Sequence, residues 1–342
     1  MKVAVYYSNK DIRIEERPIP KIGEGEVLIR NYAAGICGSD VAEWYRLGKV
    51  GRVLGHEIAG EIVAVGEGVK HLKEGLRVSA SHHVPCYQCH DCRLGNHTLC
   101  DALGKTNFDP GGFAEWIRLP PLNVSHGVYP LGDNISYEEG TFVEPLACTV
   151  RGQRKAGFRS EQTVFVIGCG IAGLLHIQLA RMRGVRRMIA TDVQEYRLNA
   201  AKKFGADFAF LSTEDILGRI QEVNEGRLAD LVIVCAGKKT AIDLALKSVE
   251  RGGTILFFAL NSPDQEISLS LHEIFWKKGV TLMNSYAASP QDHFEAMEII
   301  REGRLHLKEM ISHRLGLDEI GKGFEMVAQA QHSLKVLIDL TR

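Results

Sequence analysis

Apolar and polar residues alternate through the first third of the chain, which predicts short antiparallel strands. The alternation runs through the first 35 residues, which are punctuated by Pro18, Pro20, Gly23 and Gly25. It continues at 58–65, 76–81 and 111–119, with glycine-rich turns between these segments. We therefore expect an all-β opening half.

The pattern changes near Val164 to buried apolar runs separated by segments with helical spacing. This is typical of parallel strands joined by crossover helices. The expected strands are 164–167, 188–191, 231–234 and 254–258, and the expected helices are 172–183, 195–204, 213–224 and 240–249. The sequence thus predicts an α/β chain whose second half is a doubly wound parallel sheet.

The C-terminal tail returns to the first domain in this interpretation. An amphipathic helix at 293–301 is followed by a polar stretch and a last apolar strand at 334–340. We expect one domain from 1–151 together with 290–342, and a second domain from 152–289.

Size and charge narrow the function classes. A chain of 342 residues suits about two domains, and 41 Lys and Arg against 42 Asp and Glu leave a net charge of −1. No basic field is available to hold nucleic acid. The N-terminus is polar by Asn9, and the apolar stretch from Val164 meets His176 too soon to span a bilayer. We expect a cytoplasmic protein with no membrane segment.

Four of the eight cysteines, Cys86, Cys89, Cys92 and Cys100, lie close together in the sequence. Four thiolates can close a tetrahedron around zinc and leave no position for substrate, so this would be a structural site. A redox pair and an iron–sulfur cluster are the alternatives. The nearby histidines at 82, 83, 90 and 97 are expected to be mostly exposed loop residues, although one could replace a ligand.

A second set of candidate ligands is dispersed along the chain. Cys37 lies near two glycines, His56 and Glu57 follow about one hairpin later, and Glu144 lies within an apolar run. Each residue alone has an ordinary explanation in packing or a turn. Together, a cysteine, a histidine and a carboxylate form the open, three-ligand arrangement of catalytic zinc. Such a zinc lowers the pKa of bound water to about 7, and a bound alcohol should shift in the same direction.

A glycine loop predicts a dinucleotide site. The motif G-x-G-x-x-G follows directly on the strand at 164–167 and opens a helix; it comprises Gly168, Gly170, Ile171, Ala172 and Gly173. Asp192 ends the next expected strand, where its carboxylate can accept hydrogen bonds from ribose hydroxyls and repel a 2′-phosphate. We therefore expect NAD, while Arg197 and the arginines at 186 and 187 keep NADP open.

With these motifs in chain order, the sequence resembles the zinc-dependent medium-chain alcohol dehydrogenases over nearly its full length. It is most similar to the polyol branch, which includes sorbitol, galactitol-phosphate and butanediol dehydrogenases, with threonine dehydrogenase close by. The matching segments are 35–40, 55–57, the cysteine quartet, 111–115, 144–147 and the glycine loop.

The resemblance implies a GroES-like catalytic domain beside a Rossmann NAD-binding domain, two zinc ions per chain, and a homodimer or homotetramer. The catalytic zinc would be held by Cys37, His56 and either Glu57 or Glu144, with the two acids exchanging places or acting through water. Asp192 and Arg197 would hold NAD. The nicotinamide pocket would be lined by Phe258, Ala259, Leu260, Asn284, Ser285 and Tyr286.

The sequence departs from the family's pattern in two places. Many relatives have a histidine where Ala42 stands, so a proton relay would run from Ser39 through water or the ribose, or through zinc-bound water near Glu144. The spacing from Cys37 to His56 is also short. The intervening loop carries Arg46, Lys49 and Arg52, which either are solvated or bind an anionic substrate group.

The function expected from the sequence is NAD-linked oxidation of a secondary hydroxyl on a polyol or sugar derivative. Zinc would polarise the oxygen, and Ser39 would begin removal of the proton. The alternatives are oxidation of an amino-acid alcohol, as by threonine dehydrogenase, and a non-catalytic NAD-binding scaffold protein.

Overall fold

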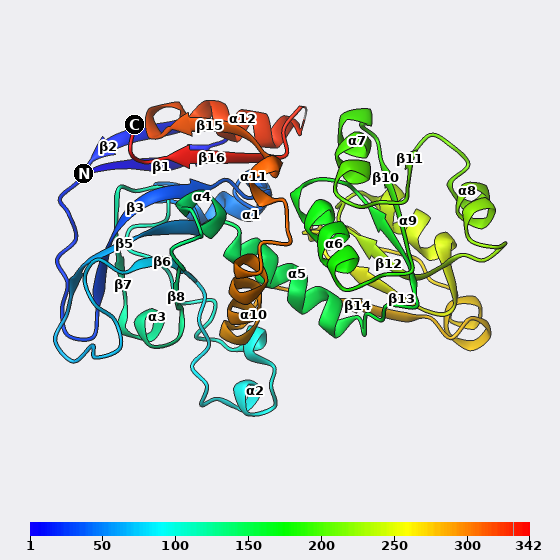
Figure 1. Ribbon diagram of the computed structural model, residues 1–342, viewed down its shortest axis with the longest axis horizontal. Helices are drawn as coiled ribbons and strands as arrows, with labels where there is room; N and C mark the ends of the chain where they lie inside the picture. Colours follow the sequence, from blue (N-terminus) through cyan, green and yellow to red (C-terminus); the bar gives the residue numbers. More distant parts are fainter. Residues whose placement is uncertain (331) are drawn as a thin grey trace. The chain divides into compact units, whose positions relative to one another are not determined.

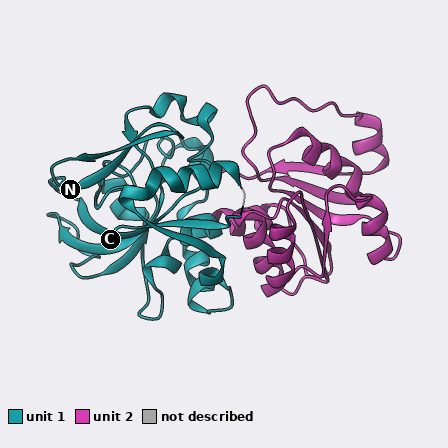
Figure 2. Cartoon of the chain, turned by 90° about the horizontal axis from the view of Figure 1, so that it is seen from above, with its two compact units in different colours: residues 1–147, 287–342 teal, residues 148–286 magenta. Residues whose placement is uncertain are grey.

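The computed structural model describes residues 1–330 and 332–342, which form two compact units. Unit 1 comprises 1–147 and 287–342, and unit 2 comprises 148–286 (Figure 2). The sequence predicts these two boundaries a few residues later, after residues 151 and 289. In the structure the first boundary falls within helix α5, Val143–Lys155.

Unit 1 is built mainly from strands, as the alternating pattern predicts. One sheet has the order β15-β16-β3-β5-β6-β8, with β7 also paired to β3, and a smaller sheet has the order β2-β1-β4. The strands are β1 Lys2–Ser8, β2 Asp11–Glu16, β3 Val27–Gly35, β4 Arg52–Val53, β5 Glu57–Val65, β6 Arg77–Ala80, β7 Trp116–Leu119, β8 Val128–Pro130, β15 Ile311–Gly316 and β16 Lys335–Asp339.

The helices of unit 1 are short apart from two near the C-terminus. They are α1 Glu43–Arg46, α2 His90–Arg93, α3 Pro121–His126, α4 Tyr137–Gly140, α10 Pro290–Arg301, α11 Leu307–Met310 and α12 Ile320–Gln329. Helix α12 packs against β15 and β16 (Figure 1). The buried side chains of Phe113 and Phe324 meet edge to face, with ring centroids 5.7 Å apart, within the apolar core of this unit.

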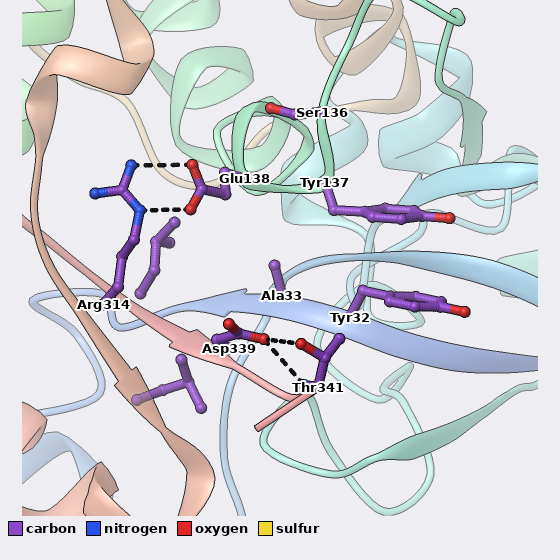
Figure 3. A pocket seen from close by; sticks show the side chains of 10 residues that line it. Tyr32, Ala33, Ser136, Tyr137, Glu138, Arg314, Asp339 and Thr341 are labelled. Atoms are coloured by element: carbon purple, nitrogen blue, oxygen red, sulfur yellow. Dashed lines mark hydrogen bonds and ion pairs between the residues drawn. The ribbon is translucent and has the colours of Figure 1, made fainter.

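Helix α4 is fixed to the large sheet by two side-chain pairs. Tyr137 of α4 stacks on Tyr32 of β3, with ring centroids 4.5 Å apart and an interplanar angle of 4°. Glu138 of α4 is paired with Arg314 of β15. Figure 3 shows both pairs around a hollow between α4 and the strands. Because its polar groups are paired with one another, we interpret the hollow as part of the α4 attachment.

Unit 2 is a six-stranded parallel sheet in the order β11-β10-β9-β12-β13-β14. The strands are β9 Thr163–Ile167, β10 Arg187–Asp192, β11 Phe208–Leu211, β12 Ala229–Val234, β13 Val249–Phe257 and β14 Thr281–Asn284. Besides most of α5 and a π-helical segment at His272–Lys277, its helices are α6 Ile171–Met182, α7 Glu195–Lys203, α8 Ile216–Val223 and α9 Lys239–Ser248. The strand order, 3-2-1-4-5-6 within the unit, is the doubly wound order of dinucleotide-binding domains.

Two elements near the C-terminus differ from what the sequence predicts. The expected polar stretch after residue 301 contains β15 and the amphipathic helix α12, which buries Ile320 and Phe324. The helix is difficult to predict from the sequence because Gly321 and Gly323 lower its helix propensity. A side chain at Gly323 would collide with Ile36, so close packing explains this glycine. No helix among the described residues is long and apolar enough to cross a bilayer.

Candidate metal centres and dinucleotide loop

The fold brings Cys37, His56 and Glu57 together. Ligand atoms of the three residues all lie within 4.8 Å of one another. Glu57 begins β5 directly opposite Gly35, which ends β3, so the register of these antiparallel strands places Cys37 beside the His56–Glu57 pair. Thiolate, imidazole and carboxylate are the donor types of catalytic zinc. The three residues therefore fit a bound zinc ion.

Glu57 is paired with Lys335 in the interior of unit 1. Both side chains are 0% exposed, and the Lys335 ammonium donates to one carboxylate oxygen. The other oxygen, Oε1, is buried without a hydrogen-bond partner, and such a group needs one. A side chain at Gly35 would overlap both Glu57 and Lys335, which explains the glycine there. The unpaired oxygen is consistent with Glu57 acting on a cation.

Asp40 is a buried residue of this site to which the sequence analysis gave no role. One of its carboxylate oxygens lies 3.4 Å from His56 Nδ1, and the other accepts a hydrogen bond from the Cys37 amide at 3.1 Å. Burial raises the pKa of Asp40, but His56, Arg46 and the Cys37 amide outweigh burial, so the pKa is lowered. An ionised Asp40 fixes the His56 ring so that Nε2 is the nitrogen available to a metal.

Ser39 and Arg46 lie beside these ligands. The Arg46 guanidinium donates to the Ser39 carbonyl at 2.8 Å, to the Ser39 hydroxyl at 3.1 Å and to Asp40 at 3.1 Å. Its side chain is only 12% exposed. Arg46 is therefore engaged with protein groups, and of the three basic loop residues only Lys49 and Arg52 stay candidates for binding an anionic substrate.

Two histidines expected to be exposed are half-buried instead. The rings of His82 and His56 have centroids 4.9 Å apart, and those of His82 and His83 lie 3.7 Å apart. Burial lowers the pKa of His82 well below its usual value and that of His83 to about 4. Both Nδ1 atoms are buried without a partner. These neutral rings beside the metal centre were missed because the adjacent cysteine motif suggested a surface loop.

Glu144 is the second residue of α5. Its side chain is not in the group of ligand atoms formed by Cys37, His56 and Glu57 among the described residues. Its role as an exchanging or water-mediated ligand stays a prediction.

The cysteine quartet is assembled around α2. The sulfur atoms of Cys86, Cys89, Cys92 and Cys100 lie within 4.8 Å of one another. The backbone amides of Cys86 and Cys89 donate to the sulfur atoms of Cys100 and Cys86, at 3.3 and 3.4 Å. Burial raises the pKa of Cys100, but three backbone amides outweigh this and bring it to about 6. Four sulfur donors, one of them stabilised as thiolate, fit a structural zinc site.

The glycine loop connects β9 to α6 as the motif predicts. Gly168 has φ of +95°, and a side chain at Gly173 would overlap the Gly168 carbonyl, so both positions require glycine. Gly170, Ile171 and Ala172 form the N-terminal end of α6, whose free amides suit a pyrophosphate. Asp192 ends β10 and accepts hydrogen bonds from the amides of Cys169 at 2.7 Å and Gln194 at 2.9 Å.

The remaining cofactor candidates lie at the same edge of this parallel sheet. Phe258, Ala259 and Leu260 follow β13, whereas Asn284 and Ser285 end and follow β14. Ser285 Oγ is buried without a partner. Arg197 lies 4.0 Å from Asp192 and close to Gly170. Because carboxyl ends of parallel strands form the ligand edge of such sheets, these positions suit a nicotinamide pocket, which stays a prediction.

Comparison with known proteins finds relatives that are dehydrogenases. Residues 23–130 match the alcohol dehydrogenase GroES-like domain, and residues 172–302 match the zinc-binding dehydrogenase family. L-threonine 3-dehydrogenase of Bacillus licheniformis is 33% identical, covering 94% of this chain and 93% of the relative. Sorbitol dehydrogenase of Bacillus subtilis is 31% identical, covering 99% and 97%.

A solved structure with a bound cofactor is similar in fold to this chain. An alcohol dehydrogenase from Escherichia coli CFT073, complexed with NADH, superimposes with a TM-score of 0.88. It is 25% identical in sequence, and the superposition covers 99% of each chain.

Proposed function

Because this chain belongs to the zinc-dependent dehydrogenase family and carries an alcohol dehydrogenase GroES-like domain, we propose that it oxidises a secondary hydroxyl of a polyol or sugar derivative with NAD⁺. The observation that carries this proposal is the convergence of Cys37, His56 and Glu57, three different donors of the kind that leave a zinc position open.

In this proposal the chain's own residues divide the work. Cys37 and His56 hold the metal, with Glu57 or Glu144 as the carboxylate, and a bound zinc supplies Lewis acidity toward the substrate oxygen. Ser39, on the segment that carries Cys37, takes up the substrate's hydroxyl proton while its own hydroxyl proton passes to water or the cofactor ribose. Asp40 orients His56 through Nδ1. The cysteine quartet holds its loop and takes no part in the chemistry.

The preference for NAD follows from Asp192. Its carboxylate is anchored to the glycine loop by the Cys169 amide and is 4% exposed, so a negative charge is fixed at the end of β10. A fixed carboxylate accepts hydrogen bonds from both ribose hydroxyls of NAD and repels the 2′-phosphate of NADP. Similar solved structures include one complex with NADH and one with NADP, so the preference rests on Asp192.

The substrate class is supported by the sorbitol dehydrogenase relative, and the threonine 3-dehydrogenase relative supports an amino-acid alcohol as the second candidate. An anionic substituent would find Lys49 and Arg52 in the loop that follows Ser39. Within this family we further propose a homodimer or homotetramer, which light scattering coupled to gel filtration measures directly.

The decisive experiment is a screen for NADH formation by the zinc-loaded enzyme. Substrates would include sorbitol and other polyols, L-threonine, sugar acids and sugar phosphates, with zinc counted per chain and Cys37→Ser as the inactive control. We expect two zinc ions per chain and turnover of a polyol or sugar derivative. Preference for threonine would favour the second candidate. One zinc per chain with no turnover of any alcohol would favour a binding protein and refute the proposal.

A further inference from the structure

The side chain of Arg46 turns back from the end of α1 onto the segment that carries Cys37. Its Nε donates to the Ser39 carbonyl, and one Nη atom donates to both the Ser39 hydroxyl and Asp40. The guanidinium also lies 4.9 Å from the centre of the Tyr45 ring. A planar fork held at three acceptors is a geometry that arginine provides and lysine does not.

Asp40 needs this guanidinium because its carboxylate is 0% exposed. A metal bound to His56 Nε2 requires a neutral imidazole ring. Such a ring donates its Nδ1–H to Asp40 but brings no positive charge to it. The Arg46 guanidinium is then the cation that the structure places on Asp40. A buried carboxylate that loses its cationic partner is strongly destabilised, and here the change would occur one hydrogen bond from a metal ligand.

The contact with Ser39 has a separate consequence. A hydroxyl group has one donor hydrogen and two acceptor lone pairs. Arg46 occupies one lone pair of Ser39 Oγ, which leaves one acceptor and one donor. That is what a relay needs: one acceptor for the substrate proton and one donor for the next group. Arg46 thus restricts the Ser39 hydroxyl to the orientations that suit transfer, in a chain that has alanine at position 42.

We propose that Arg46 is a positioning residue of the metal centre: its guanidinium pairs with the buried Asp40 carboxylate that contacts His56, and it orients the Ser39 hydroxyl. The inference deepens the proposed alcohol oxidation and rests on it for the Ser39 half. The Asp40 half concerns metal retention alone, so it can be tested even if no substrate is turned over.

The test compares Arg46→Met and Arg46→Lys with a matched control, Arg13→Met, which removes an arginine from an exposed ion pair with Asp11 in the same unit. Each zinc-loaded protein would be dialysed against a graded chelator, with zinc counted per chain, and kcat and KM would be measured on the substrate found in the screen. The thermal midpoint would be recorded in parallel.

We expect Arg46→Met to release the zinc at Cys37 and His56 at about 10- to 100-fold lower chelator concentration than wild type. The kcat should fall by about the same factor, which is the usual effect of removing a partner of a metal ligand. Arg46→Lys should restore zinc retention, because it restores the charge, but not kcat, because an ammonium lacks the fork. If Arg46→Met matched Arg13→Met in both measurements, the inference would be overturned. If Arg46→Lys restored neither zinc retention nor kcat, the argument that a positive charge at Asp40 retains the zinc would be refuted. If Arg46→Lys restored both, the argument that Arg46 orients the Ser39 hydroxyl would be refuted.

A double variant covers the case in which Arg46→Met folds poorly. Asp40→Asn removes the charge that Arg46 neutralises, so Asp40→Asn with Arg46→Met should retain zinc better than Arg46→Met alone and recover its thermal midpoint. Purely additive losses in the double variant would show that Arg46 does not act through Asp40, and the inference would fail. If the double variant recovered zinc retention and thermal midpoint as expected but no substrate were turned over, the result would instead count against the proposed substrate class.

Discussion

Lys335, near the end of the chain, donates a hydrogen bond to Glu57 although the two residues are 278 positions apart. Neither side chain reaches solvent. The ring of Phe142 lies 5.7 Å from the ammonium, so the pair is enclosed by apolar surface as well. The carboxylate of Glu57, itself a candidate metal ligand, is thus paired with a lysine of β16, the strand that pairs with β3.

Removal of this lysine should destabilise unit 1. Lys335→Met leaves the buried Glu57 charge unpaired, and breaking a buried ion pair costs about 3–5 kcal/mol. Urea unfolding of protein without zinc at Cys37, in which no metal can pair with Glu57, would measure the loss. The double variant Lys335→Met with Glu57→Gln should recover most of it, because no unpaired charge is left. Equal stability of wild type and Lys335→Met would contradict the pairing.

The two zinc sites should respond differently to loss of one sulfur. Cys100→Ser removes one of the four sulfur ligands of the structural site, so we expect the zinc content to fall toward one per chain. The thermal midpoint should drop on the order of 5–10 °C, since 1 kcal/mol shifts the midpoint by about 2–4 °C in domains of this size. Cys37→Ser should abolish turnover with little change in the midpoint. Elemental analysis and calorimetry of both variants measure this contrast, and full turnover in Cys37→Ser would refute the metal assignment.

Asp192 should control cofactor choice. Asp192→Asn keeps an oxygen that can accept from the Cys169 amide but removes the charge that repels a 2′-phosphate. Hydrogen bonds to charged groups contribute about 1.5–3 kcal/mol, so kcat/KM for NAD⁺ should fall about 10- to 100-fold while that for NADP⁺ rises. Steady-state kinetics with both cofactors would show it. Asp243→Asn, in an exposed pair with Lys239, is the control.

His176 should make the protein sensitive to acid. The ring is fully buried in α6, and burial followed by repulsion from Arg183 lowers its pKa to about 3. Below the unfolded pKa of about 6.5 the unfolded chain binds a proton that the folded chain refuses, so stability is lost as the pH falls from 6.5 toward 3. The loss approaches about 1.4 kcal/mol per pH unit.

A leucine variant isolates this contribution. In His176→Leu the Gln153 amide keeps its hydrogen bond to the backbone carbonyl of residue 176. Urea unfolding at pH 7.5 and 5.0 should show a smaller loss for the variant than for wild type, by about 2 kcal/mol. The same pH dependence in both proteins would mean that His176 is protonated in the folded state.

Local signals made much of this molecule predictable. The apolar runs at β9, β10, β12 and β13 were recognisable because strands buried on both faces are continuously hydrophobic. The short strand β14 was missed because Thr281 and Asn284 are exposed and its apolar content is small. In the metal centre, Cys37, His56 and Glu57 carry motifs of their own. Lys335 carries none, since its role arises from strand pairing between distant segments.

The position of β16 also bears on how the chain is made. Ribosomes deliver β3 and β5 long before β16, so the nascent chain holds the Glu57 carboxylate without its lysine while unit 2 is being synthesised. Since β16 pairs with β3 along Ala33, Ala34 and Gly35, that edge of the sheet stays open for the same interval. Docking of β16 therefore closes the strand edge and pairs the buried acid in one step, and a chain that lacked β16 would expose an aggregation-prone edge beside an uncompensated carboxylate.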